Sequence, residues 1–105
     1  MNKNTQRPRN NALYEAILRL KTVDECVAFM EDLCSVMELK AMEQRFEVAE
    51  LLYEGHIYSD ILARTGASSA TISRVNRSLQ YGSDGYAIVL NRKKQEPDDD
   101  SESDD

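Results

Sequence analysis

The sequence predicts an all-α fold of about six helices, because three features of the chain agree. Apolar residues recur at spacings of three and four along most of the chain, which is the period of one helix face. Polar start signals and glycine stops separate these periodic segments. The apolar run of residues 86–90 is ambiguous between strand and helix on periodicity alone, but no other segment offers it a strand partner. We therefore expect this run to be helical as well.

The first two helices are predicted in the most N-terminal third of the chain. A first helix extends over residues 10–21. Its apolar face consists of Leu13, Ile17 and Leu20, spaced by four and three. A second helix begins after Thr22, which forms a capping box with Glu25. The face of this helix that is expected to pack in the core consists of Cys26, Phe29, Met30 and Leu33.

The two cysteines, Cys26 and Cys34, are expected to be buried free thiols. A separation of eight residues on one helix places their Cα atoms about 12 Å apart, which is too far for a disulfide. The single histidine, His56, is expected to be a solvated loop residue, and no pair of Cys or His residues has zinc-site spacing. We therefore expect no cofactor and no metal site.

A long third helix is predicted from the capping box of Ser35 and Glu38 to about Glu54, where Gly55 offers a left-handed stop. It carries two apolar stripes. The first consists of Leu39, Met42, Phe46, Ala49 and Tyr53, and the second of Met37, Ala41, Val48 and Leu52. Because so short a chain has little material to cover both sides of this helix, we expect a homodimer with the helix near the interface. The alternative is a monomer whose first and last helices cover both sides.

The next part of the chain has the outline of a helix-turn-helix. A short helix is predicted over residues 59–64, a turn at 66–67, and a second helix over 68–80 that Ser68 caps and Gly82 ends. Many helical hairpins contain a glycine turn, so this outline alone also fits a purely structural hairpin. The second helix decides between the two interpretations.

That second helix has an outward face suited to duplex DNA. At 100° per residue, Ile72, Val75 and Leu79 lie on one side and are expected to face the core. The opposite side has two arginines, small hydroxyl residues and no acid. Small residues let the helix backbone approach a groove closely, and arginine donates to phosphate or guanine. The residues expected to contact DNA are Ser68, Ser69, Ala70, Thr71, Ser73, Arg74 and Arg77.

The distribution of charge favours this interpretation over an ordinary solvated face whose arginines pair with the preceding acidic helix. Residues 56–81 contain three arginines against one acid, whereas residues 22–54 contain nine acids against two bases. Basic charge therefore gathers where the groove helix is predicted, which is typical of nucleic-acid binding.

The ends of the chain differ in charge from its body. The 105 residues carry a net charge of −6, yet residues 1–95 hold 13 bases against 12 acids and the last ten hold seven acids. We expect one domain over residues 10–94, a disordered basic arm over 1–9 and a disordered acidic tail over 95–105. The arm would reach flanking phosphates or a minor groove. The tail either competes with nonspecific DNA or only adds solubility.

Several classes of protein are disfavoured. No apolar run approaches the roughly 18 residues of a membrane span and no signal peptide is apparent, so we expect a cytoplasmic protein. No phosphate loop, nucleophile elbow or metalloprotease motif is present. The acids Glu43, Glu47, Glu50 and Glu54 form a ladder along one helix rather than a convergent pair. We therefore do not expect an enzyme.

The most distinctive stretches of the chain are FMEDLCSVMELKAMEQRFEVAELL and TGASSATISRVNRSLQYGSDGY. They resemble the Trp repressor superfamily, and within it the YerC/YecD-type branch of TrpR-related proteins, with a resemblance that covers roughly residues 10–90. It implies an all-helical fold and an intertwined dimer whose two reading heads enter successive major grooves. It also implies recognition contacts at Ser69, Ala70, Ser73 and Arg74.

The resemblance also bears on the ligand. In the tryptophan-sensing member, the indole lies between two arginines and beside a glycine. Arg74 matches the arginine of the recognition helix, but Gln44 stands at the position of the other arginine and Val75 at that of the glycine. A branched side chain would then occupy the space of the ring. We therefore expect DNA binding that does not depend on tryptophan and is constitutive or controlled by another signal.

These features together predict a dimeric, sequence-specific transcription regulator that binds an inverted-repeat operator in double-stranded DNA, with half-sites about one helical turn apart. Repression is favoured by analogy, because the fold obstructs promoters without an evident activation surface. The alternative is a protein-interaction adaptor that keeps the fold without DNA binding.

Overall fold

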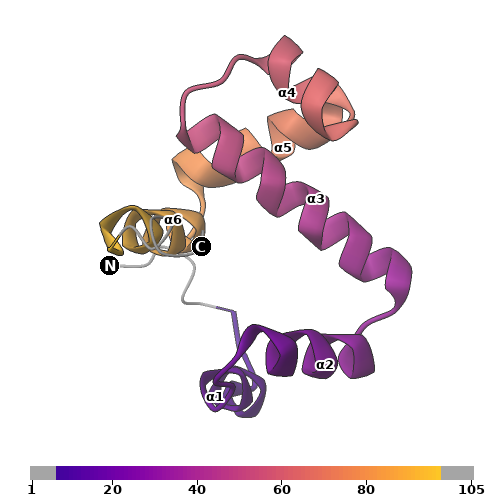
Figure 1. Ribbon diagram of the computed structural model, residues 1–105, viewed down its shortest axis with the longest axis vertical. Coiled ribbons are helices and arrows are strands. Elements are labelled where there is room, and N and C mark those ends of the chain that lie inside the picture. The colour runs from indigo at the N-terminus through magenta and orange to yellow at the C-terminus, as the bar shows by residue number, and fades with distance from the viewer. Residues whose placement is uncertain (1–6, 98–105) are drawn as a thin grey trace, which may run out of the picture.

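The computed structural model describes residues 7–97, which form six α-helices and no strand (Figure 1). The helices are α1 (Asn11–Leu18), α2 (Val23–Leu33), α3 (Val36–Tyr53), α4 (Tyr58–Thr65), α5 (Ser69–Tyr81) and α6 (Gly85–Gln95). The predicted all-α fold is confirmed. Most of the predicted basic arm and acidic tail, at residues 1–6 and 98–105, lies outside the described residues, so their disorder stays a prediction.

Helix boundaries follow the capping signals of the sequence. Ser35 and Glu38 close a full capping box, because the amide of Glu38 donates to Ser35 Oγ at 3.2 Å and the amide of Ser35 donates to the Glu38 carboxylate at 2.8 Å. At the start of α2 the hydroxyl of Thr22 also accepts from the amide of Glu25, at 3.0 Å. The carboxylate of Glu25 accepts from the amide of Lys21 instead of that of Thr22. Local chemistry thus fixes where α2 and α3 begin.

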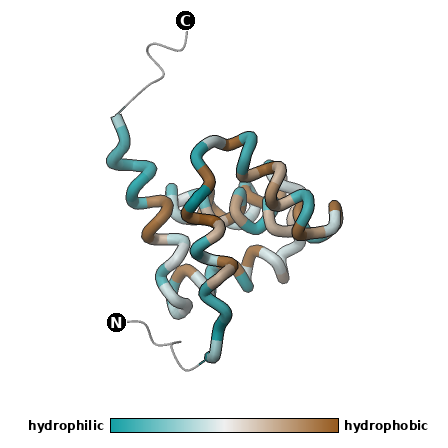
Figure 2. The backbone as a smooth tube through the Cα atoms, turned by 90° about the horizontal axis from the view of Figure 1, so that it is seen from below, coloured by the Kyte–Doolittle hydropathy of each residue, from teal (hydrophilic) through white to brown (hydrophobic). Residues whose placement is uncertain are grey.

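Two helices differ in length from the prediction. The first, α1, ends at Leu18 rather than near Lys21. The last, α6, extends well beyond the predicted apolar run, from Gly85 to Gln95. Figure 2 shows that its hydrophobic turns give way to hydrophilic turns that lead to the C-terminal end. Arg92, Lys93 and Lys94 lie in this last turn, where cations complement the helix dipole.

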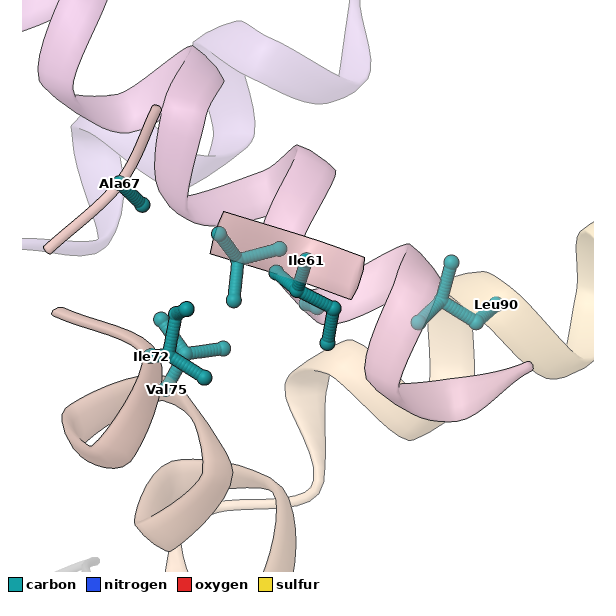
Figure 3. Close-up of a cluster of buried hydrophobic side chains, with 7 residues drawn as sticks. Ile61, Ala67, Ile72, Val75 and Leu90 are labelled. Carbon is teal, nitrogen blue, oxygen red and sulfur yellow. The ribbon is translucent and has the colours of Figure 1, made fainter. Parts of the chain in front are cut away.

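One core joins the second half of α3 to the three helices that follow it (Figure 3). Its buried residues are Val48, Ala49, Ile61, Ala67, Ile72, Val75 and Leu90. Phe46 of α3 and Tyr86 of α6 flank this core, with ring centroids 6.3 Å apart. We call this unit of α4, α5 and the second half of α3 the head. Burial of these apolar side chains stabilises the orientation of α5 on α3.

The predicted core face of α2 is wrong. No residue of α1 or α2 is buried, and Figure 1 shows both helices at the N-terminal end of α3, away from α4 and α5. Phe29 and Met30 are half-buried, whereas Leu33 is 51% exposed. The expectation of buried thiols is also wrong, since Cys26 is exposed and Cys34 half-buried. The physical reason is that, within residues 7–97, α2 packs mainly against α3, which covers only part of its apolar face.

Burial of the two apolar stripes of α3 depends on the position along the helix and not on the face. Val48 and Ala49, in its second half, are buried although they belong to different stripes. Met37 and Ala41, in its first half, are exposed, and Met37 exposes 75% of its surface. The head therefore covers both sides of α3 at one end, whereas the first turns of α3 pack mainly against α2 within residues 7–97.

Neither a membrane-spanning helix nor a metal site is found among residues 7–97. Within residues 7–97, no helix is long and apolar enough to cross a membrane. In the same part of the chain, no group of three or more His, Cys, Asp or Glu side chains is arranged to hold a metal ion.

Candidate nucleic-acid interface

A helix-turn-helix is formed by α4, a short turn and α5. Gly66 ends α4 with φ +72° and ψ 6°, a left-handed conformation that favours glycine. Ser68 begins α5, because its hydroxyl accepts from the amide of Thr71 at 3.1 Å. The predicted motif and both of its boundary signals are confirmed. The first helix begins at Tyr58, one residue before the predicted start.

Thr65 holds the turn between the two helices. Its hydroxyl donates to the carbonyl of Ile61 at 2.8 Å and accepts from the amide of Ala67 at 3.0 Å. Its carbonyl accepts from the side-chain amide of Gln44 at 3.3 Å. Ala67 itself is buried in the core. The turn is thereby fixed both to α4 and to α3, which sets the angle at which α5 leaves it.

The orientation of α5 follows from its buried side. Ile72 is fully buried and Val75 is 1% exposed, so this side faces the core as predicted. Arg74 and Arg77 lie on the opposite side and are exposed. The helix contains no acidic residue. Its outward face therefore presents positive charge to solvent.

The seven predicted contact residues have different environments in the structure. Five are exposed, namely Ser68, Ser69, Ala70, Arg74 and Arg77. Thr71 and Ser73 are half-buried, on the flanks of the outward face. The hydroxyl of Ser68 donates to that of Thr71 at 3.1 Å. These two side chains thus also hold the first turn of α5 in shape.

Both arginines of the outward face are available to a ligand. The ion pairs within residues 7–97 are those of His56 with Glu54 and Asp60, Arg64 with Asp60, and Lys93 with Glu50. None of them involves Arg74 or Arg77. The alternative interpretation was an ordinary solvated face whose arginines pair with the acids of α3. Among the described residues, neither guanidinium forms such a pair.

Sequence reasoning missed a further residue of this face, Tyr81. It is 71% exposed and, with Arg74, Arg77, Ser78 and Gly82, lines a hollow of about 310 Å³ on the second half of α5. The signal was present in the spacing, since Tyr81 follows Arg77 by four residues and Arg74 by seven. Residues at these intervals lie on one side of a helix.

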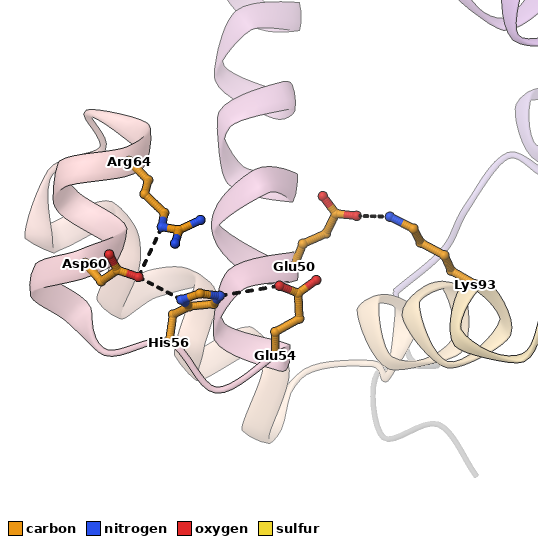
Figure 4. Close-up of polar contacts among 6 residues, drawn as sticks. All are labelled: Glu50, Glu54, His56, Asp60, Arg64 and Lys93. Atoms are coloured by element: carbon orange, nitrogen blue, oxygen red, sulfur yellow. Dashed lines mark hydrogen bonds and ion pairs between the residues drawn. The ribbon is translucent and has the colours of Figure 1, made fainter. Parts of the chain in front are cut away.

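A polar network fixes the linker between α3 and α4 (Figure 4). Nδ1 of His56 lies 2.7 Å from Asp60 Oδ2, and its Nε2 lies 3.5 Å from Glu54 Oε1. Arg64 Nε donates to the same Asp60 oxygen at 3.1 Å. The hydrogen bond from His56 lowers the pKa of the Asp60 carboxyl, with Arg64 adding to the effect and partial desolvation opposing it. His56 is therefore a half-buried, bonded residue and not the solvated one that was expected.

The fold and the helix-turn-helix define the class of protein: it is an all-α protein that presents a basic helix on a packed head. The chain matches the Trp repressor protein family over residues 9–94. It is 49% identical over 83 residues to YerC, an uncharacterized protein of Bacillus subtilis, and this match covers 79% of the chain and 80% of YerC. The chain belongs to the Trp repressor family, whose members are helical DNA-binding regulators.

Two solved structures show the same fold. A candidate Trp repressor from Staphylococcus aureus aligns with a TM-score of 0.77 and 44% identity, covering 86% of this chain and 93% of that one. A TrpR-like protein from Eubacterium eligens aligns with a TM-score of 0.77 and 51% identity, covering 84% and 91%. The resemblance seen in the sequence is thus confirmed at the level of family and fold.

Proposed function

We propose that this protein is a sequence-specific transcription regulator that binds double-stranded DNA as a homodimer through α5. The observation that carries the proposal is the outward face of α5, where exposed Arg74 and Arg77 stand opposite the buried Ile72 and Val75. A rigidly backed helix that contains no acid, and whose two guanidiniums form no ion pair within residues 7–97, is suited to the major groove.

The proposed contacts divide by chemistry. The small exposed residues Ser69 and Ala70, at the N-terminal end of α5, would let the backbone approach the groove floor, and the amides there favour phosphate. Ser73 would contact base edges or bridging water, since hydroxyl groups accept several bases. Arg74 and Arg77 would donate to phosphate or guanine. Ser68 and Thr71 would act mainly by holding the first turn of α5.

Dimerisation is proposed from the apolar surface that one chain leaves open. Eight large apolar side chains between residues 14 and 37 are exposed, namely Tyr14, Ile17, Leu18, Val23, Val27, Leu33, Val36 and Met37. Beside them α2 and α3 form a groove of about 560 Å³ with an apolar floor that includes Met30, Met42 and Phe46. Exposed apolar surface of this extent is typical of an interface. A second copy would cover it and place two heads against an inverted repeat.

Independence from tryptophan is proposed from the same contacts that hold the head. Val75 is buried in the core, and the amide of Gln44 bonds the carbonyl of Thr65. Both side chains therefore already have protein partners at the positions that matched the ligand site of the tryptophan-sensing member. Calorimetry with L-tryptophan should detect no binding in the micromolar range, and micromolar binding would overturn this part of the proposal.

The decisive experiment is selection of binding sites from random duplex DNA, followed by charge reversal. We expect an enriched inverted repeat, and loss of binding by about a hundredfold or more when Arg74→Glu and Arg77→Glu are combined. The control combines Arg92→Glu and Lys94→Glu on α6, which changes the net charge equally away from the helix-turn-helix. Failure to enrich any sequence, or equal effects of the two double variants, would favour a protein-interaction adaptor that keeps the fold.

The regulatory direction and cellular location are proposed with the function. Repression is the simplest outcome of a small dimer that occupies promoter DNA. The cytoplasm is proposed as the location because the relatives with this fold are bacterial, and bacterial DNA lies in the cytoplasm. A reporter gene placed behind the selected operator tests the direction. Repression predicts higher expression when the regulator is deleted.

A further inference from the structure

The hollow on the second half of α5 has the chemistry of an anion site. The residues that line it are Arg74, Arg77, Ser78, Tyr81 and Gly82, whose side chains include two guanidinium groups and two hydroxyl groups. Among the described residues, no carboxylate lines it. Arginine and hydroxyl donors without an opposing acid are the groups that bind phosphate in proteins.

Tyr81 is the side chain that most needs an explanation. It exposes 71% of its surface at the end of a helix whose other large apolar residues are buried or half-buried. No hydrogen bond to its hydroxyl occurs within residues 7–97. A tyrosine held in solvent beside two arginines is therefore positioned to donate to a ligand rather than to support the fold.

Gly82 is the one residue without a side chain among those that line the hollow. A Cβ at this position would lie 2.5 Å from the carbonyl oxygen of Ser78, which is closer than real Cβ contacts. Glycine is thus required by the conformation with which the chain leaves α5, and bare backbone lies beside Ser78 and Tyr81.

The position of the hollow along α5 indicates which anion it meets. Ala70 and Tyr81 are separated by eleven residues, which correspond to about 16 Å of helix, whereas the major groove is about 12 Å wide. When the N-terminal end of α5 lies in the groove, its other end must reach the groove's edge. The sugar–phosphate backbone runs along that edge.

We propose that Arg77, Tyr81 and Ser78, together with Arg74, bind one phosphate group of the DNA backbone at the edge of the major groove. This inference rests on the proposed function and adds Tyr81 and Ser78 to the contact residues. Both arginines are needed, because the C-terminal end of a helix carries partial negative charge that opposes an anion. The contact would fix the register of α5 without reading sequence.

The test measures the affinity of wild type and Tyr81→Phe for the selected duplex and for unrelated duplexes, over a series of salt concentrations. Loss of one hydroxyl that donates to a charged oxygen should weaken binding by about tenfold or more for every duplex, without changing the salt dependence. Arg77→Ala should weaken binding for every duplex and reduce the salt slope by about one. Tyr53→Phe on α3, which removes the hydroxyl of another exposed tyrosine, should have no effect.

Each other outcome counts against the proposal. Unchanged affinity of Tyr81→Phe, while wild type binds DNA, would overturn it and leave the proposed function intact. A loss confined to one sequence would also overturn it, because that pattern indicates base reading. The hollow could also bind the phosphate of a free small molecule instead of a DNA phosphate. Titrating inorganic phosphate alone and following the resonances of Tyr81 by NMR distinguishes the two. If wild type binds no duplex but phosphate shifts those resonances, the proposed function fails and the source of the phosphate is not DNA.

Discussion

The head and the α1–α2 region differ in how much apolar surface they bury within a single chain. The head buries Ile61, Ile72 and Val75 within one chain, so its helices have a fixed arrangement without any partner. The α1–α2 region has no fully buried residue, and Leu18 and Val23 expose 83% and 78% of their surfaces. The contrast teaches that the head, which carries the proposed DNA-binding helix, is packed within a single chain, whereas α1 and α2 leave exposed the apolar surface that the proposed dimer would cover.

The largest expected effect comes from matched isoleucine substitutions in the two regions. Ile72→Ala removes a fully buried side chain and should lower the free energy of unfolding by about 2–5 kcal/mol. Ile17→Ala on α1, a residue that is 39% exposed, should change it by no more than about 1.5 kcal/mol at protein concentrations too low for association. Denaturant unfolding at several concentrations measures both. Equal effects at low concentration would contradict the contrast.

A smaller effect is expected on association. Val27→Glu places a carboxylate on the floor of the α2–α3 groove, among the acids at its rim, and should weaken the dimer at least about tenfold. Leu62→Glu on α4 is the control, since it charges an apolar residue of the head that is exposed to a similar degree. Light scattering reports the mass of each variant. If both variants keep the mass of the wild type, the groove is not the interface.

The next effect concerns the bond between the long helix and the turn. Gln44→Met keeps the length of the side chain but removes the donor to the Thr65 carbonyl, which should destabilise the head by about 1 kcal/mol. DNA affinity should fall with it, because the angle of α5 would be less well defined. Thermal unfolding and a DNA titration of the same variant check both results. Unchanged values in both would show that apolar packing alone positions α5.

The smallest effect is a dependence of stability on pH. The pKa of Asp60 is lowered by the hydrogen bond from His56 and by Arg64, so this carboxylate stabilises the fold above its ordinary pKa of about 3.9. That contribution is lost as the pH falls below this value and through the lowered pKa. Asp60→Asn should therefore be less stable than wild type at neutral pH, and the difference should shrink in acid. A constant difference across this range would exclude the linkage.

Local signals account for the part of the fold that the sequence predicts correctly. Ser35, Ser68 and Gly66 act through bonds and conformations within a few residues, so each could be recognised without knowing the tertiary structure. The outward face of α5 was predictable for the same reason, since the spacing of Ile72 and Val75 determines which side is buried.

The parts that were wrong or missed depend on how side chains are arranged in space, which the periodicity of single helices does not determine. The apolar face of α2 looks the same in sequence whether its own chain or a second chain covers it, so its exposure could not be predicted. The environment of His56 depends on Asp60 one helical turn further on and on Glu54 at the end of α3. Tyr81 was missed because an aromatic residue at a helix end usually indicates packing rather than a contact with solvent.

Hydroxyl-radical footprinting of the selected duplex tests the account most directly, because it reports both the groove helix and the pairing of two heads. We expect two protected backbone patches whose centres are about one helical turn, or 34–36 Å, apart, and both should disappear in the variant that reverses the charge of Arg74 and Arg77. A single patch, or protection that survives the reversal, would contradict it.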